Sequence, residues 1–176
     1  MKQDEIKNFL PAVFQRTVRA ENPLAALLDV MENLHAPAEK ILENVERFFD
    51  ARRTPDEFVP FLAHWVNLDR IFWATEKTDL DSPLMPKIGY LRELVANATY
   101  LAQWRGTKKG LLLFLQTATG VKDFEIDERV KDADGQIRPF HLKIRAPEAL
   151  RAQEDLIRRI IESEKPVHLT YEIDFF

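Results

Sequence analysis

The segment at residues 105–110, Arg-Gly-Thr-Lys-Lys-Gly, contains residue types that bind phosphate in nucleotide-binding loops. Glycines let the backbone approach phosphate oxygens, and lysines supply positive charge. A P-loop, however, follows a strand, has four residues between its glycines, and continues with a lysine and then a serine or threonine. Here three residues separate Gly106 from Gly110, Leu111 follows, and the preceding segment has helical periodicity. The sequence therefore predicts a joint between helices, in which Gly106 ends one helix and Thr107 caps the next.

Four carboxylates in the last third of the chain could form a catalytic cluster: Asp127, Glu128, Glu172 and Asp174. They fall on predicted strands, at solvent-facing or edge positions where acidic residues keep a protein soluble and discourage edge pairing. A hydrolase also needs a convergent nucleophile, base and stabiliser. The chain has only two serines and no Gly-x-Ser-x-Gly motif. We therefore expect no catalytic residue and no enzyme activity.

Histidines are the remaining candidates for metal ligands. His64 lies beside Trp65 in a predicted helix, and His141 and His168 lie in predicted strands. The chain contains no cysteine, and no acidic cluster near these histidines has the spacing of a metal site. The sequence therefore predicts no metal site and no cofactor.

Composition and charge limit the partners of the chain. Its 176 residues are 45% hydrophobic and 31% charged, with a formal net charge of -4. This balance is typical of a globular protein and offers no general attraction to nucleic acid or anionic lipid. The basic residues of the last predicted helix are interrupted by acidic ones, which indicates a solvated helix face; they are Arg151, Arg158, Arg159 and Lys165. We expect neither a nucleic-acid partner nor a small-molecule substrate.

The chain also lacks the sequence signs of membrane insertion. No stretch reaches the about 20 apolar residues that cross a bilayer. The first residues lack the apolar region of a signal peptide. We expect a protein made in the cytoplasm, with no direct membrane insertion.

A long helix is predicted at about residues 22–50. Asn22 is a good N-cap, and Pro23 suits the first helical position. Apolar residues then recur in two series with a seven-residue period, Leu24, Met31, Ala38 and Val45, and Leu27, Leu34, Ile41 and Phe48. Such a pattern indicates a helix packed lengthwise in a coiled coil or bundle, and Leu28 widens the stripe. The sequence leaves open whether the stripe lies inside a monomeric bundle or at a subunit interface.

Further helices are predicted at about 55–68, 88–104 and 107–118. The first has capping-box spacing at Thr54 and Glu57. Its apolar face consists of Phe58, Phe61, Leu62, Trp65 and Val66. Residues 70–90 have no clear period and are interpreted as a connector.

The last third of the chain changes from helical to alternating periodicity. Two alternating segments flank an Asp-Gly turn and predict a hairpin, followed by a helix and a third strand. The predicted fold is therefore α+β, with a helical region at 1–120 and a ββαβ domain at 121–176.

Several segments in this order resemble the phage tail protein I family, the small wedge proteins of contractile-tail baseplates. The resemblance covers most of the chain. Its characteristic parts are Leu-Pro-x-x-Phe at Leu10–Phe14, Phe-Asp followed by Thr-Pro-x-x-Phe and Leu-Ala-x-Trp at 49–65, and the Arg-Gly-Thr-x-x-Gly joint. None of these motifs is a catalytic signature.

The resemblance implies a structural protein without enzyme activity, made in the bacterial cytoplasm and located in the baseplate of a virion or phage-tail-like injection system. It implies partners in a larger baseplate wedge protein and neighbouring baseplate subunits, which together form a helical core bundle and a ring around the central hub. The residues expected at the partner interface are Leu24, Leu27, Met31, Leu34, Ile41, Val45 and Phe48. The alternative is a self-contained helical adaptor, unrelated to tails, that uses the same stripe within one chain.

Overall fold

The computed structural model describes residues 3–19, 22–72, 85–132 and 135–176, and its contacts group them into two compact units. The first unit comprises residues 1–48, and the second comprises residues 49–176. Each unit has its own packing and is described separately below.

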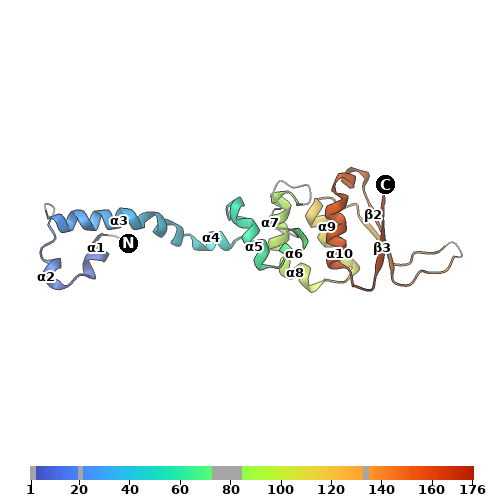
Figure 1. The fold of residues 1–176 in the computed structure, drawn as a ribbon, viewed down its shortest axis with the longest axis horizontal. Helices are drawn as coiled ribbons and strands as arrows, with labels where there is room; N and C mark the ends of the chain where they lie inside the picture. The colour runs from blue at the N-terminus through green and yellow to red at the C-terminus, as the bar shows by residue number, and fades with distance from the viewer. Residues whose placement is uncertain (1–2, 20–21, 73–84, 133–134) are drawn as a thin grey trace. The chain divides into compact units, whose positions relative to one another are not determined.

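The first unit consists of helices. Helix α1 (Gln3–Asn8) and the short α2 (Ala12–Gln15) precede the long α3 (Pro23–Leu42), as Figure 1 shows. The side chain of Asn22 accepts a hydrogen bond from the backbone N–H of Leu24 at 2.8 Å, which confirms the predicted N-cap. Helix α1 packs on α3. Among the described residues of this unit, the buried side chains are Ile6, Ala25 and Leu28.

The prediction of one continuous helix to residue 50 is wrong, because α3 ends at Leu42 and a second helix, α4 (Val45–Phe49), follows. Asn44 explains the break. Its backbone N–H donates to the carbonyl of Ile41 at 3.2 Å, while its side chain donates to the carbonyl of Lys40 at 3.1 Å. The side chain thus takes the acceptor that a continuing helix would use, as asparagine often does.

The second unit begins with short helices. A 3-10 turn η1 (Asp56–Phe58) leads into α5 (Val59–Trp65), and α6 (Asp69–Phe72) follows. The predicted capping box is wrong, because the Thr54 hydroxyl is buried without a hydrogen-bond partner. The carbonyl of Thr54 instead accepts a hydrogen bond from Arg92 at 2.7 Å. Most of the predicted connector, residues 73–84, lies outside the described residues.

Three further helices complete the helical part: α7 (Ile88–Ala96), α8 (Ala98–Gln103) and α9 (Lys108–Thr119). The helix predicted at 88–104 is therefore divided at Asn97, whose side chain donates to the carbonyl of Glu93 at 2.8 Å. Gly120 closes α9 in the left-handed conformation, with φ of 74°.

The C-terminal part is a three-stranded sheet with a helix between its last two strands, which confirms the predicted α+β class and ββαβ order. Strand β1 (Glu125–Asp127) pairs antiparallel with β2 (His141–Ala146), and β2 pairs parallel with β3 (Thr170–Phe175). A 3-10 segment η2 (Glu148–Gln153) and α10 (Glu154–Glu164) connect β2 to β3. Part of the predicted Asp-Gly turn, residues 133–134, lies outside the described residues.

One hydrophobic core joins the helices of the second unit to the sheet. Figure 1 shows α9 and α10 on the same side of the sheet. Their buried residues, including Phe114 and Ile160, share a core with Phe72 of α6 and Ile144 of β2. The residues of this core come from both sides of residue 120 in the sequence. The division into domains at 1–120 and 121–176 stays a prediction.

Within the described ranges, no helix is both long enough and apolar enough to cross a membrane.

Candidate functional site

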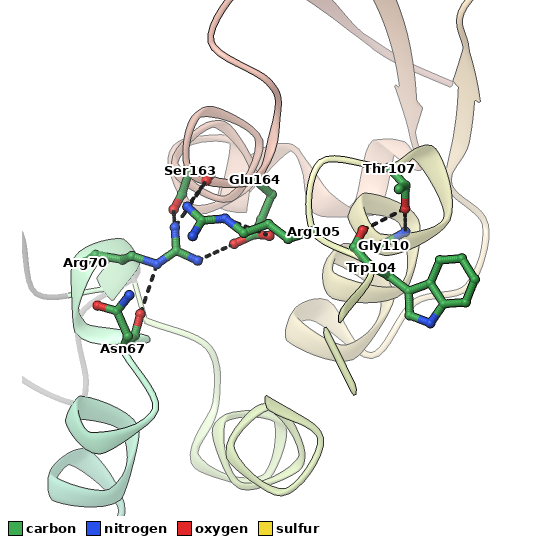
Figure 2. A network of polar contacts seen from close by, with 8 residues as sticks. All are labelled: Asn67, Arg70, Trp104, Arg105, Thr107, Gly110, Ser163 and Glu164. Atoms are coloured by element: carbon green, nitrogen blue, oxygen red, sulfur yellow. Dashed lines mark hydrogen bonds and ion pairs between the residues drawn. The ribbon is translucent and has the colours of Figure 1, made fainter. Parts of the chain in front are cut away.

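The Arg-Gly-Thr-Lys-Lys-Gly segment forms the predicted joint between helices. Gly106 adopts φ of 74°, which is the left-handed conformation that glycine accommodates. The Thr107 hydroxyl donates to the carbonyl of Trp104 at 2.6 Å and accepts from the backbone N–H of Gly110 at 3.0 Å, as Figure 2 shows. Lys109 lies with its Nζ 3.8 Å from the centroid of the Trp104 ring. The residue types that suggested a phosphate loop thus form a tight corner between α8 and α9.

We expect a moderate loss of stability when the Thr107 cap of this corner is removed. We expect Thr107→Ala to lower the free energy of unfolding by about 1 kcal/mol, the usual value of a helix N-cap. Thr107→Ser keeps the hydroxyl and is expected to retain most of the free energy of unfolding that Thr107→Ala loses. Urea denaturation followed by tryptophan fluorescence measures both variants. An equal loss in the serine variant would show that the methyl group, rather than the cap, stabilises the corner.

Two arginines bind the C-terminal end of α10 beside this corner. Arg70 of α6 donates to the carboxylate of Glu164 at 2.5 Å and to the carbonyl of Ser163 at 3.1 Å. Arg105 donates to the same carbonyl at 3.0 Å and lies 3.9 Å from the Glu164 carboxylate. Figure 2 shows both guanidinium groups directed at this helix end, where positive charge complements the helix dipole. Because Glu164 is only 5% exposed, the network joins α6, α10 and the 105–110 joint through a buried carboxylate.

The four carboxylates that could have formed a catalytic cluster serve ordinary surface roles. Glu172 and Asp174 on β3 both bind Lys143, at 3.2 Å and 2.6 Å. These hydrogen bonds raise the pKa of the Lys143 ammonium above its usual range. Asp127 accepts the backbone N–H of Arg129 at 2.8 Å. Such contacts are those of a charged sheet surface.

The histidines are also placed without a metal-binding geometry. His64 forms a hydrogen bond with Asp69 at 2.7 Å, and His141 is buried and forms one with Thr170 at 2.8 Å. His168 lies before β3 rather than within it, against the ring of Phe140. Across the part of the chain that the structure describes, no group of three or more His, Asp or Glu side chains could hold a metal ion.

Three of the four basic residues of the last predicted helix form ion pairs with neighbouring carboxylates. Arg151 binds Glu148 at 2.6 Å, and Arg158 binds Glu154 at 2.6 Å. Lys165 binds Glu162 at 3.2 Å. The Nη1 atom of Arg159 is buried and has no hydrogen-bond partner among the described residues.

The seven residues expected at a partner interface lie on α3 and α4. Five are exposed and two are half-buried: Leu27, Met31, Leu34, Ile41 and Val45 are exposed, and Leu24 and Phe48 are half-buried. Leu27 is 55% exposed, Leu34 73% and Ile41 54%, which is unusual for apolar residues with a regular spacing. We call this row of seven residues the heptad stripe.

Helix α1 covers only the N-terminal part of α3. Helix α1 covers the flank of α3 that carries Ala25 and Leu28, both of them buried. Leu28 was predicted to widen the stripe, and it is instead part of the small core of the first unit. Beyond Leu28 no side chain of α3 is buried, so most of the heptad stripe stays exposed.

A second apolar surface lies within the larger unit, on the apolar face predicted for residues 55–68. The rings of Phe58, Phe61, Trp65 and Phe49 form a continuous series, with centroid distances of 4.8, 4.9 and 5.5 Å. Phe61 is 45% exposed and Trp65 60%, whereas Leu62 between them is buried. Trp65, Phe49 and Val95 line a hollow of about 380 Å³. The spacing of apolar residues predicted the helix face, and it could not show which part of that face is covered.

A family model described as phage tail protein (Tail_P2_I) matches residues 16–168. No curated protein sequence matches the chain. The matched range contains α3 with the heptad stripe, the 105–110 joint and the ββα part of the C-terminal unit. Because the match covers most of the chain, this protein belongs to the Tail_P2_I family of phage tail proteins.

Proposed function

We propose that this protein is a structural baseplate wedge component of a contractile phage tail or phage-tail-like injection system, without enzyme activity. In this role it assembles with a larger wedge protein around the central hub. Family membership supports a structural role in a phage tail. The observation that carries the more specific proposal is the exposed heptad stripe on α3 and α4.

The heptad stripe has the chemistry of a helix–helix interface. Its residues repeat every 3.5 positions on average, and within a continuous helix such as α3 this period keeps one face against a partner. Covering one exposed leucine or isoleucine contributes about 1.5–3 kcal/mol. A partner that supplies two or more helices can therefore recover enough free energy to offset the cost of association. We propose that the stripe packs against helices of the larger wedge protein, while the ββαβ unit contacts a neighbouring subunit.

Such a bundle also suits the mechanical task of a baseplate. The plate holds the sheath extended and then rearranges when a receptor signal arrives. Packed helices have a small number of discrete arrangements, so they can hold one state firmly and change to another as units.

The test compares two double variants with the same change in charge. Leu34→Lys with Ile41→Lys places two cations on the heptad stripe. Ala26→Lys with Asn33→Lys places two cations on exposed positions of α3 that are not part of the heptad stripe. All four positions are exposed, so both variants are expected to stay folded, with far-UV circular dichroism and melting temperature close to those of the original chain.

We expect the original chain and the control variant to form a stable mixed complex when co-expressed with the larger wedge protein. The stripe variant is expected to lose about 100-fold in affinity, since charges in a buried apolar interface remain unpaired. Size exclusion with light scattering measures the mass of each complex. A stripe variant that binds as tightly as the control, or an original chain that stays a monomer beside the wedge protein, contradicts the proposal and favours a self-contained adaptor.

A further inference from the structure

Strand β3 forms one edge of the sheet, with its backbone paired on one side. Strand order in the sheet is β1-β2-β3. Thr170 donates its backbone N–H to the carbonyl of Phe140 at 2.9 Å, and Phe176 donates to Ala146 at 3.0 Å. Because successive residues of a strand direct their backbone groups to opposite sides, the N–H and C=O groups of Tyr171, Ile173 and Phe175 point away from β2. In the described ranges, no strand pairs with them.

The core-facing side of the sheet is incomplete at this edge. Leu142, Ile144 and Ala146 of β2 are buried, at 7%, 0% and 0% exposure. Their register partners on β3, which are Tyr171, Ile173 and Phe175, are half-buried although they contact the same core. The difference arises because β2 has a strand on both sides and β3 has one. A further strand would cover the open flank of these three side chains.

The charge on the outer face of the sheet indicates which kind of strand could pair with β3. The outer face carries Glu125 and Asp127 on β1, Lys143 and Arg145 on β2, and Glu172 and Asp174 on β3. Both edges are thus acidic, and carboxylates outnumber the lysine and arginine between them. Pairing two copies of this chain through these edges would place carboxylates opposite carboxylates, which is destabilising in a sheet. A second copy is therefore a poor partner, and a basic strand is a good one.

The surroundings on the core side favour apolar partner side chains. Arg151 lies 4.9 Å from the ring centroid of Phe175, and its guanidinium is already bound by Glu148. Arg158 near Tyr171 is bound by Glu154 in the same way. With these cations neutralised, a side chain entering from the edge meets aromatic surface and ion pairs without excess charge.

We propose that the free edge of β3 accepts an extended segment of a neighbouring tail subunit, in which lysine or arginine alternates with valine, isoleucine or an aromatic residue. Backbone groups of Tyr171, Ile173 and Phe175 pair with the segment, its basic side chains face Glu172 and Asp174, and its apolar side chains complete the core. This mode of binding is strand addition. It rests on the proposed contact between the ββαβ unit and a neighbour.

The test uses a capped seven-residue peptide of alternating lysine and valine as the probe. A peptide of the same composition, with its lysines in one block and its valines in another, controls for charge. We expect the alternating peptide to bind at least tenfold more tightly, by fluorescence titration. We also expect it to slow amide hydrogen exchange at Tyr171, Ile173 and Phe175 by at least tenfold, as followed by NMR. Equal binding of the two peptides, or unchanged exchange at these amides, overturns the proposal.

Two charge reversals on opposite edges provide matched protein variants. Asp174 and Glu125 both lie on the outer face, both are exposed, and each binds a cation of β2, at 2.6 Å and 3.3 Å. We expect Asp174→Lys to weaken the alternating peptide at least tenfold and Glu125→Lys by no more than about twofold. Equal weakening by both would indicate attraction by net charge and contradict an edge-specific site.

The peptide test and the test of the wedge complex report on different surfaces of the protein. Asp174→Lys is expected to leave the complex with the larger wedge protein intact, because the heptad stripe is unchanged. Loss of peptide binding therefore reports on β3, whereas loss of the mixed complex in the Leu34 and Ile41 variant reports on α3.

Discussion

Gly110→Ala is expected to be among the most destabilising single substitutions in the second unit, with a loss of about 3 kcal/mol in the free energy of unfolding. A Cβ atom at this position would lie 1.9 Å from the carbonyl oxygen of Trp104 and 2.6 Å from its carbonyl carbon. These are backbone atoms of the corner between α8 and α9, so no side-chain rotation relieves the overlap. The corner must open, and with it the hydrogen bonds of Thr107 to Trp104 and Gly110.

Gly89→Ala is the matched control for this substitution. Gly89 also lies in the first turn of a helix, α7, and a Cβ there meets no atom within 4 Å. Alanine at an exposed helical position is about 1 kcal/mol more favourable than glycine, so this variant is expected to gain stability. Urea denaturation followed by tryptophan fluorescence measures both, because all three tryptophans lie beyond residue 48. A neutral Gly110→Ala variant would show that the corner is easily displaced.

Glu164→Ala is expected to cost about 3 kcal/mol, since removing one member of a buried ion pair leaves its partner uncompensated. Arg70 loses the carboxylate that it binds at 2.5 Å, and its guanidinium then faces Arg105 without a negative charge between them. The Arg70 side chain is 27% exposed, so water compensates only part of the loss.

Glu162→Ala provides the control on the same helix. Glu162 binds Lys165 at 3.2 Å, but its side chain is 57% exposed, and surface pairs of this kind contribute about 0–1 kcal/mol. We expect its midpoint of urea denaturation to stay close to that of the original chain. A second check is the double variant Arg70→Ala with Glu164→Ala, which should lose less than the sum of the two single variants. Additive losses would argue against direct coupling between the two side chains.

The fold class and several helix ends could be predicted because they depend on local chemistry. Asn22, Thr107 and Gly120 cap their helices as their residue types indicate. The change from helical to alternating periodicity placed the ββαβ order correctly. The helix breaks at Asn44 and Asn97 were missed, because each depends on a side-chain hydrogen bond to one carbonyl within an otherwise helical pattern.

The sequence could not show which residues of the candidate surfaces are exposed and which are buried. A seven-residue period predicted the heptad stripe, while its exposure depends on how little of the chain packs on α3. The apolar face of α5 was also predicted, yet the sequence could not show that Phe61 and Trp65 are exposed whereas Leu62 is buried. The sequence did not single out Glu164. Its burial depends on Arg70 and Arg105, which are distant in sequence and meet it only in the folded chain.

The small core of the first unit affects how long a copy without its partner survives in the cell. With only Ile6, Ala25 and Leu28 buried among its described residues, this unit opens at a low cost in free energy, whereas the larger unit has an extensive core. In a free subunit we expect this unit to be more accessible to cellular proteases than the larger unit, and binding of the heptad stripe by the proposed partner would remove that access. Degradation would then clear surplus copies selectively, so the supply of this protein would be matched to that of its partner without any dedicated regulator.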